Sequence, residues 1–394
     1  MIKHKAYKYR LYPTKEQEIL LAKHFGCNRF IYNYFLDLAK KAYQENKEKI
    51  EAERINKNIS YYENAALLTQ LKKQPKLEWL KETNSQSLQA TLKNLETAYK
   101  RFFQKKSKFP KFKSKYGKQS YKVPQSIIIK DSRVSIPKFK DGIKVKIHRA
   151  LEGKILSATI SKNSAEQYFI SITCELDIKP LLKNNKAIGI DLGIKTFVVC
   201  SDEIDYDLPK TIKELDKKIK YRHKQLSKKK KGSNNRNKAR VKLAKTYLKI
   251  HNIRQDFLHK TSTEIIKNHG IICIEDLAVK DMMSNHRLAK SIGDQAWGEL
   301  CRQLGYKSDW YGRELVAIDR YFPSSKTCHV CGFINQNLAL SERVWICPNC
   351  ESLLNRDGNA SLNIERQGLN LINRSGGNRR VKPLEPPALA GAMN

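Results

Sequence analysis

Three carboxylates in the second half of the chain stand where an expected strand or helix meets a loop. Asp191 and Glu275 each follow a short apolar run that is typical of a buried strand. Asp357 opens a helical pattern, at a position where it could also be the N-cap. Mg²⁺ prefers carboxylate oxygens as ligands, and a pair of such ions can activate a water and stabilise the leaving oxygen of a phosphodiester. Together the three side chains predict a metal-dependent nuclease, whereas Asp191 alone could equally be a turn residue.

The strand before Asp191 belongs to the run A-I-G-I-D-L-G-I-K-T-F-V-V at residues 187–199. This pattern predicts two antiparallel strands joined by a tight turn at Gly193. Residues 315–318 form another expected strand, and it ends at Asp319. We interpret Asp319, a fourth carboxylate, as structural. Strands that alternate with amphipathic helices in this half of the chain indicate an α/β domain.

Four of the nine cysteines form two pairs with the spacing of a structural zinc site. Two residues separate Cys328 from Cys331, fifteen residues follow, and two residues separate Cys347 from Cys350. With four thiolate ligands from the protein, the zinc would have no open position for a substrate. The other five cysteines lie singly in apolar segments and are predicted to be buried in a reducing compartment: Cys27, Cys174, Cys200, Cys273 and Cys301.

The chain is strongly basic along almost its whole length. Its 76 lysines and arginines against 39 aspartates and glutamates give a formal net charge of +37. Such a charge predicts a polyanionic partner, and nucleic acid is the first candidate. A membrane is not expected, because no run approaches the roughly 18 apolar residues of a spanning helix. Residues 1–5 (M-I-K-H-K) lack the apolar core of a signal peptide, which predicts a cytoplasmic protein.

The first half of the chain combines strands and helices. Residues 5–12 alternate in a way that predicts a strand with one basic face, and Thr14 with Gln17 resembles a capping box. Segment 123–177 holds several short alternating runs, which predict a small barrel or sandwich that the first strand could join. The largely helical region between them would then be an insertion. Residues 104–122 interleave lysines with aromatics, which suits phosphates and unstacked bases as well as plain solvent.

Two helical surfaces are candidates for nucleic-acid contact. The helix that carries the apolar stripe 88–102 presents Gln86, Gln89 and Lys93 on its other face, where ordinary solvation is an equally good explanation. Residues 212–257 predict a helical hairpin whose basic tip would repel itself unless a polyanion lies beside it. The candidates at this tip are Lys228, Lys229, Lys230 and Arg236.

The order of several motifs along the chain resembles TnpB, the family of RNA-guided nucleases encoded by bacterial insertion sequences and similar to the ancestor of the type V CRISPR nucleases. The motifs are I-G-I-D-L-G-I-K, I-E-D-L, F-P-S-S-K-T-C-x-x-C-G, W-x-C-P-x-C and N-R-D-G-N-A-S-L-N-I. The opening K-A-Y-K-Y-R-L-Y-P-T and the segment G-C-N-R-F-I-Y-N resemble the same family. The resemblance covers the chain up to its last 20 or so residues, and its C-terminal motifs are the most specific.

This resemblance implies a multidomain α+β fold. A β-rich, wedge-like barrel with an inserted helical recognition lobe would precede an α/β nuclease domain of the RNase H-like (RuvC) type with an inserted zinc ribbon. The implied boundaries are 1–13 and 121–180 for the wedge-like domain, 14–120 for the recognition lobe, 187–322 and 352–368 for the nuclease domain, 323–351 for the zinc ribbon and 369–394 for a flexible tail.

The resemblance also implies an activity, which is RNA-guided cleavage of DNA on behalf of a transposable element. Asp191, Glu275 and Asp357 match the family's catalytic triad, which would bind two Mg²⁺ ions, and the four paired cysteines would bind one Zn²⁺. Guide RNA and double-stranded target DNA are the implied partners of a monomeric protein in the bacterial cytoplasm, associated with the nucleoid. Glu351 departs from the glycine of many relatives, at a knuckle turn rather than at a ligand.

Two other functions fit parts of the same sequence. A nuclease-inactive, RNA-guided DNA-binding regulator would be expected to lose one or more triad carboxylates, and this chain keeps all three. A DNA transposase acting without RNA could use the same carboxylates, but it would not need the wedge-like and recognition-like regions. Cleavage that requires RNA separates the transposase from the RNA-guided nuclease.

Overall fold

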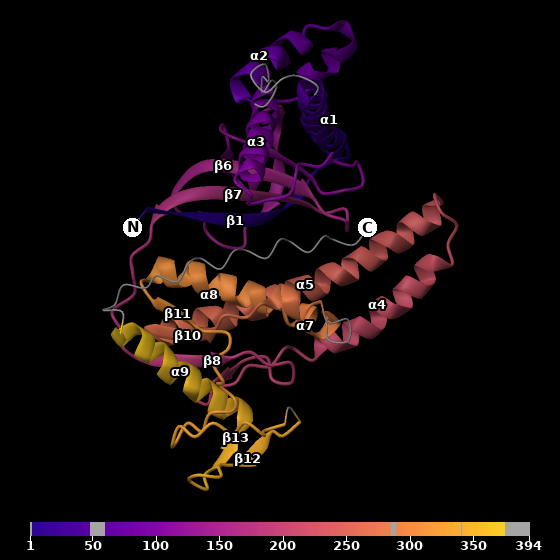
Figure 1. Cartoon of the computed structure of the whole chain (residues 1–394). Helices are drawn as coiled ribbons and strands as arrows, with labels where there is room; N and C mark the ends of the chain where they lie inside the picture. The colour runs from indigo at the N-terminus through magenta and orange to yellow at the C-terminus, as the bar shows by residue number, and fades with distance from the viewer. Residues whose placement is uncertain (1, 48–59, 285–288, 340, 375–394) are drawn as a thin grey trace. The chain divides into compact units, whose positions relative to one another are not determined.

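The computed structural model describes residues 2–47, 60–284, 289–339 and 341–374 (Figure 1). The chain divides into two compact units, Met1–Asp177 and Ile178–Asn394, and each is described by itself. Among the described residues, no helix has both the length and the apolar character needed to cross a bilayer.

The first unit consists of a sheet and a group of helices. Its strands and helices, in chain order, are β1 (Ile2–Tyr12), α1 (Lys15–Lys47), α2 (Tyr61–Leu71), a 3₁₀ helix (Pro75–Glu82), α3 (Ser85–Phe103), β2 (Gln119–Val123), β3 (Ile128–Lys130), β4 (Arg133–Ile136), β5 (Phe139–Lys146), β6 (Lys154–Lys162) and β7 (Tyr168–Asp177).

The sheet of the first unit has seven strands in the order β2-β6-β7-β1-β5-β4-β3. The first strand joins it as predicted, because β1 pairs antiparallel with β7 on one side and with β5 on the other. Tyr7, Tyr9 and Leu11 alternate into its core. The order ends at β2 and β3, so strand pairing among the described residues does not close the sheet, and a barrel is not confirmed.

The helices of the first unit share a second core, built between α1, α2 and α3. The predicted capping box is confirmed at the start of α1. The backbone N–H of Gln17 donates to Thr14 Oγ1 (3.3 Å), and the backbone N–H of Thr14 donates to Gln17 Oε1 (3.1 Å). Asn84 caps α3, and the predicted apolar stripe of this helix is buried, with Leu88 and Leu92 in the core.

The second unit contains the following strands and helices: β8 (Ala187–Asp191), β9 (Val199–Cys200), α4 (Thr211–Ser227), α5 (Asn234–Asn268), β10 (Ile271–Glu275), α6 (Val279–Met282), α7 (Ala289–Gln295), α8 (Trp297–Tyr311), β11 (Glu314–Ile318), β12 (Val344–Ile346), β13 (Leu353–Asn355) and α9 (Arg356–Arg374).

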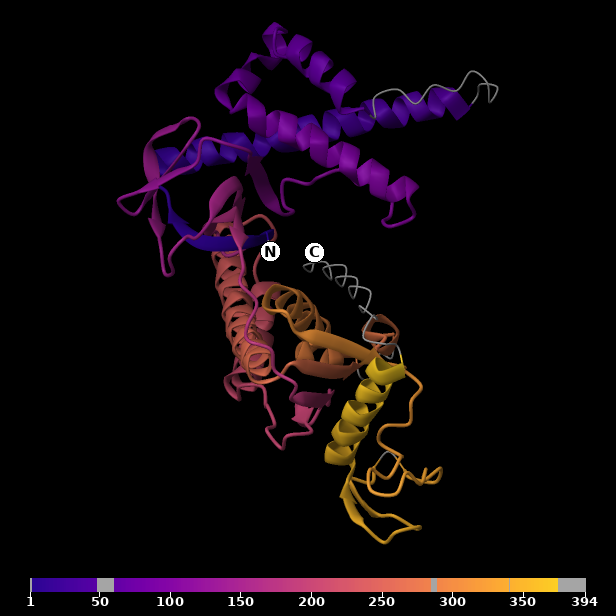
Figure 2. The same ribbon diagram turned by 90° about the vertical axis from the view of Figure 1, so that its left-hand side faces the viewer.

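A four-stranded sheet in the order β11-β10-β8-β9 forms the centre of this unit. β8, β10 and β11 run parallel, and β9 is antiparallel to β8. Side chains alternate across each strand, so Ile272 and Ile274 pack with α5 and α8, whereas Cys273 packs with α9. Helices thus lie on both faces of the sheet (Figure 1, Figure 2). The predicted α/β domain and the predicted helical hairpin, α4 and α5, are confirmed.

Two details of the sequence prediction are wrong in this unit. β8 and β9 pair antiparallel, but residues 192–198 connect them irregularly instead of through a tight turn at Gly193. The connection is longer because it carries Phe197 into the core, where the ring packs against Phe257 with centroids 5.4 Å apart. The helix α9 also continues past residue 368 to Arg374, since its last turns pack on the sheet core. The rest of the predicted tail, 375–394, lies outside the described residues.

Two glycines allow α9 to lie directly against the sheet. A Cβ atom added to Gly189 of β8 would stand 2.0 Å from the backbone oxygen of Ser361, and one added to Gly368 of α9 would stand 2.2 Å from the Sγ atom of Cys273. No side chain fits into either contact, so glycine is required at both positions. This close contact fixes α9, and with it Asp357, relative to the strand ends.

We expect Gly189→Ala to destabilise the second unit, because the new methyl group collides with backbone that has no room to move. Overpacking of a dense core costs about 1–3 kcal/mol of unfolding free energy. Gly305→Ala is the matched control, since it lies in the same unit within α8 and its Cβ would meet only Leu315 Cδ2, at 4.0 Å. The control should be neutral or slightly stabilising. Urea unfolding of both variants measures this, and equal stability of the two would contradict the explanation.

A buried lysine joins α8 to α5. Lys307 is 5% exposed, and its ammonium group donates to Ser262 Oγ (2.6 Å), to Thr263 Oγ1 (2.8 Å) and to the backbone oxygen of His259 (2.9 Å). Burial, together with a smaller contribution from the charge of Arg302, lowers the pKa of Lys307 to about 8. The hydrogen bonds satisfy the ammonium group without fully offsetting its loss of water.

Lys307 therefore predicts a pH dependence of stability. Between pH 8 and pH 10.5 the unfolded chain holds the proton that the folded chain has lost, so the free energy of unfolding rises with pH in this window. We expect wild type to gain up to about 3 kcal/mol relative to Lys307→Met across it. Urea unfolding at several pH values, followed by tryptophan fluorescence, measures the difference. A difference that stays constant from pH 8 to pH 10 would show that Lys307 titrates normally.

Candidate active site and cysteine cluster

Asp191 and Glu275 lie at the same edge of the central sheet. Each is the last residue of its strand, β8 or β10, and these two strands are parallel neighbours. The register pairs Ile190 with Ile274, so the two carboxylates follow at equivalent positions. The apolar residues before them are buried in the core, which fixes the strand ends. Parallel pairing is thus what brings together two residues 84 positions apart in the sequence.

Asp357 comes from a segment much later in the chain, where it lies in the first turn of α9. It is not the helix cap, because the side chain of Asn355 accepts from the backbone N–H groups of Asp357 and Gly358, both at 3.1 Å. The carboxylate of Asp357 is therefore free of the capping role that the sequence left open. The packing of α9 on β8 and β10 carries it toward Asp191 and Glu275.

The electrostatics of the site indicate that Asp191 lies close enough to Glu275 and Asp357 for their charges to affect it. Burial, followed by the negative charges of Glu275 and Asp357, raises the pKa of Asp191 to about 7, although a backbone hydrogen bond from Leu192 and the charge of Arg356 oppose the shift. Burial also raises the pKa of Glu275, against a hydrogen bond from Ser324 that lowers it. Negative charges that are buried close together repel one another, and a cation bound among them offsets this repulsion. This donor set of carboxylate oxygens fits a hard divalent cation.

One cation of the protein already touches the site. Arg343 lies just before β12, and its Nη1 atom is 3.0 Å from Oδ1 and 3.3 Å from Oδ2 of Asp357. Nothing in the sequence distinguishes Arg343 from the many other basic residues, so its place beside Asp357 was not predicted. Within the described ranges, the only group of three or more potential metal ligands whose atoms all lie within 4.8 Å of one another is the cysteine cluster. The three carboxylates are neighbours but are less tightly gathered.

The fourth carboxylate, Asp319, follows β11 at the same edge of the sheet. Its Oδ1 atom accepts from the backbone N–H of Tyr321 at 2.8 Å, which closes the turn after the strand. This contact gives Asp319 the structural task that the sequence analysis assigned to it.

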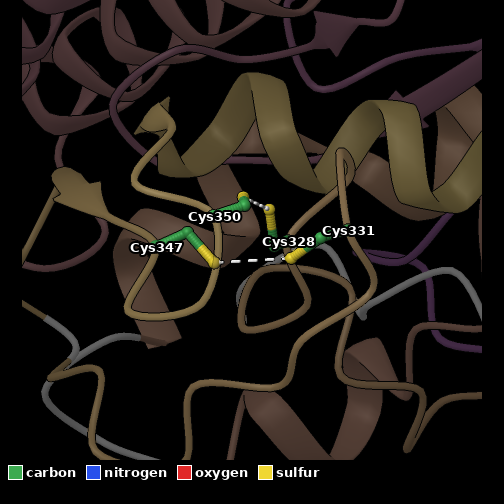
Figure 3. A group of neighbouring side chains, drawn as sticks. All are labelled: Cys328, Cys331, Cys347 and Cys350. Carbon is green, nitrogen blue, oxygen red and sulfur yellow. Dashed lines mark hydrogen bonds between the residues drawn. The ribbon is translucent and has the colours of Figure 1, made fainter.

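The four paired cysteines meet as their spacing predicts, with all four Sγ atoms within 4.8 Å of one another. Figure 3 shows Cys328 facing Cys350 (3.7 Å between sulfurs) and Cys331 facing Cys347 (3.6 Å). Hydrogen bonds lower the pKa of Cys331, first of all the one with Asn349, to about 6. The cluster therefore offers at least one thiolate at neutral pH, as a metal requires.

The two knuckles of this cluster have matching backbone turns. The N–H of Gly332 donates to the oxygen of Cys328, and the N–H of Glu351 donates to the oxygen of Cys347, both at 2.9 Å. Gly332 has a φ of 81° and Glu351 a φ of 57°. Glu351, the departure from the family pattern, thus adopts the left-handed conformation that favours glycine. The knuckle tolerates it and keeps its ligand in place.

The predicted nucleic-acid contacts lie on both units. On α3, Gln89 and Lys93 are exposed and Gln86 is half-buried, and Lys93 Nζ stands 4.8 Å from the centre of the Tyr61 ring. At the α4–α5 turn the three predicted lysines are exposed. Arg236 differs, because its Nη1 donates to the backbone oxygens of Leu226 and Lys229, both at 2.9 Å. Arg236 thus holds the turn that displays Lys228, Lys229 and Lys230.

Comparison with protein families gives three matches that follow one another along the chain. Residues 170–286 match a family described as a probable transposase, OrfB of IS605, and residues 297–364 match the Cas12f1-like TNB domain. Residues 1–48 match a family described as a helix-turn-helix domain. The described part of this segment, residues 2–47, contains one strand, β1, and one long helix, α1.

Full-length relatives and one solved structure agree with these matches. A Streptomyces pristinaespiralis protein named "Putative RNA-guided DNA endonuclease" is 38% identical over 93% of this chain and 89% of its own length. The Escherichia coli protein InsQ, which carries the same name, is 32% identical over 92% of both chains. The fold is similar to that in a Cas12f1–sgRNA–target DNA complex, with a TM-score of 0.56, 15% identity and coverage of 92% of this chain and 99% of that one.

Identity at this level over nearly the whole chain establishes kinship, and the sequence motifs around the three carboxylates and four cysteines lie within the matched regions. The structural likeness to Cas12f1 adds that the fold is shared well beyond the range of evident sequence identity. This chain belongs to the TnpB family, whose relatives bear the name of RNA-guided DNA endonucleases.

Proposed function

We propose that this protein is an RNA-guided DNA endonuclease of a transposable element. The observation that carries the proposal is the arrival of Asp191, Glu275 and Asp357, from three distant segments, at one end of a buried sheet. The names of the relatives and the excess of positive charge support the same function. A guide RNA would select the target by base pairing, while the protein holds the backbones of both nucleic acids.

In this proposal Asp191, Glu275 and Asp357 hold two Mg²⁺ ions. When bound, Mg²⁺ would polarise the scissile phosphate and neutralise charge that develops on its oxygens. Asp191 and Glu275 are suited to this task, because the ends of buried strands restrict their movement. Arg343 would offer its guanidinium group to a phosphate near Asp357, since a planar fork of donors matches phosphate geometry. The chemistry requires no covalent bond to a side chain.

The cysteine cluster would hold one structural zinc ion. Four thiolates complete a tetrahedral site and leave no position for a substrate, so zinc here would fix the fold of residues 323–351. Around the cluster, the hydrophobic core is very small, with Leu338, Trp345 and Leu354 as its main apolar members. A segment with so few buried side chains depends on a metal for its stability.

The two units would divide the binding of nucleic acid. The seven-stranded sheet would serve as the wedge-like domain and the helices α1, α2 and α3 as the recognition lobe, with Gln86, Gln89 and Lys93 among the contacts. The tip of the α4–α5 hairpin would place Lys228, Lys229 and Lys230 against phosphates. The protein would act as a monomer in a ribonucleoprotein within the bacterial cytoplasm.

Cleavage by the purified ribonucleoprotein tests the proposed activity. We expect it to cut a plasmid that carries a target matching the co-purified RNA beside a randomised flank, in Mg²⁺ but not in EDTA. Asp191→Ala should lower the cleavage rate by about 1000-fold or more, as removal of a metal ligand costs several kcal/mol in the transition state. Asp319→Asn is the matched control at the same edge of the sheet, and it should cut at the wild-type rate.

Other results of this assay would support one of the two alternative functions. Target binding that depends on the guide, without cutting, would mean that the protein is an RNA-guided regulator. DNA joining by a protein that carries no RNA would mean that it is a transposase acting alone. Equal loss of activity in Asp191→Ala and Asp319→Asn would show that the assay detects damage to the fold rather than loss of a ligand.

The metal content of the purified protein tests the zinc site. We expect one zinc per chain in wild type, and less than half of that in Cys347→Ser, because a neutral hydroxyl is a poor replacement for a thiolate. Cys301→Ala removes a buried cysteine of the same unit that lies outside the cluster, and it should keep its zinc. Elemental analysis by mass spectrometry makes the measurement. Wild-type protein without zinc, or a Cys347→Ser variant that retains it fully, would refute the assignment.

A further inference from the structure

Ser324 lies beside one of the proposed metal ligands. Its hydroxyl group donates a hydrogen bond to Oε1 of Glu275, with 2.5 Å between the two oxygens. The hydroxyl must be the donor when Glu275 is ionised, because a charged carboxylate only accepts. Ser324 is 7% exposed and comes from the segment between β11 and the first cysteine pair, 49 residues from Glu275. The hydroxyl group therefore reaches Glu275 only because the fold holds this segment against the end of β10.

Two asparagines of α9 hold the segment in place. Asn359 and Asn363 are one helical turn apart, and each is 2% exposed. The Nδ2 atom of Asn363 donates to the backbone oxygens of Ser324 (2.9 Å) and Thr327 (2.6 Å), and that of Asn359 donates to the oxygen of Thr327 (2.7 Å). On its other side, the Oδ1 atom of Asn359 accepts from the backbone N–H of His329 at 2.8 Å. The two asparagines therefore hold the chain at Ser324, Thr327 and His329.

These hydrogen bonds form one path between two of the proposed metal ligands. The path begins at Glu275, passes through Ser324 to the amide of Asn363, and continues along α9 to Asp357. The two residues that link the Glu275 carboxylate to α9, Ser324 and Asn363, are buried, so water competes little for their hydrogen bonds. The helix that presents Asp357 thereby also sets the position of the hydroxyl group that bonds Glu275.

We propose that Ser324 is a positioning residue for Glu275, and that Asn359 and Asn363 keep Ser324 in register with the helix that carries Asp357. The proposal rests on the proposed function, in which Glu275 binds a divalent ion. A glutamate has several rotatable bonds, and a hydroxyl donor on one carboxylate oxygen would restrict them while the second oxygen stays available to a metal ion. Loss of such an outer partner typically lowers metal affinity about 10–100-fold.

Binding of Mn²⁺ to the full chain, measured by electron paramagnetic resonance without cleavage, tests this role. We expect Ser324→Ala to weaken Mn²⁺ binding at least tenfold and Ser324→Thr, which keeps the hydroxyl group, to restore it to within threefold. Ser308→Ala is the matched control, because Ser308 is buried in the same unit and its hydroxyl makes no hydrogen bond to any residue that the structure describes. It should bind Mn²⁺ like wild type. With no Mg²⁺ or Mn²⁺ added, and with the zinc retained, Ser324→Ala and Ser308→Ala should unfold within 2 °C or so of each other.

Cleavage gives a second measurement of the same role. Ser324→Ala should require about tenfold more Mg²⁺ for half-maximal cutting and approach the wild-type rate at saturating Mg²⁺, because the ligand is still present. A lower maximal rate with an unchanged Mg²⁺ requirement would overturn the positioning role. So would unchanged Mn²⁺ binding in Ser324→Ala.

Glu275→Gln separates failure of this proposal from failure of the proposed function. If Glu275→Gln abolishes Mn²⁺ binding while Ser324→Ala leaves it intact, the positioning role alone is wrong. If Glu275→Gln also binds Mn²⁺ like wild type, the metal site itself is wrong and the proposal falls with it.

The part assigned to the asparagines is tested by a double-mutant cycle on Mn²⁺ affinity. Leucine is nearly the same size as asparagine but has no hydrogen-bond donor. If Asn363 acts only through Ser324, adding Asn363→Leu to Ser324→Ala should cause no further loss, and the double variant should bind Mn²⁺ no more weakly than Ser324→Ala alone. Losses that multiply in the double variant would show that Asn363 acts independently of Ser324.

Discussion

The close contact between α9 and the central sheet is the constraint on which the second unit depends. Gly189 and Gly368 remove the two side chains that would separate them, and the contact leaves no space for a methyl group at either position. The helix thereby covers one face of the sheet, completes a core with Cys273 and Val316, and presents Asp357 at the strand ends. A single packing contact thus serves stability and the site together. It requires residues that have no chemistry of their own, and it tolerates almost no variation.

Much of this arrangement could be predicted from the sequence because the signals are local. Alternation indicated the strands, an apolar stripe indicated α3, and cysteine spacing indicated the cluster, since ligands on two knuckles must follow one another at short intervals. The carboxylates were recognisable because each ends or begins an element. Their convergence was supplied by family resemblance and not by any pattern, because parallel pairing between β8 and β10 depends on contacts between distant segments. The assignment of Asp191, Glu275 and Asp357 as metal ligands stays a prediction.

What the sequence did not reveal has a common cause. Arg343 lies outside every motif quoted for the resemblance, and nothing in its neighbours marks it. Ser324 and the two asparagines of α9 lie within those motifs, but a motif does not reveal which distant groups its side chains contact. The irregular connection after β8 was mistaken for a tight turn because Phe197, which anchors it in the core, resembles one more strand residue. Arg236 was grouped with its basic neighbours although its guanidinium group binds backbone oxygens of the turn. Side-chain type alone does not distinguish a group that binds a partner from one that holds its own loop.

The position of α9 in the chain order has a consequence for biosynthesis. The strands with Asp191 and Glu275 are made first, then the cysteine cluster, and only then the helix that carries Asp357 and covers the sheet. On the ribosome the sheet face around Cys273 and Ile318 therefore stays uncovered until α9 emerges. The first unit, which precedes all of these segments, can fold earlier and separately. A nascent chain would thus have its N-terminal unit ready for a partner before it could possess a complete set of site residues, so the order of synthesis delays cutting until the last layer is in place.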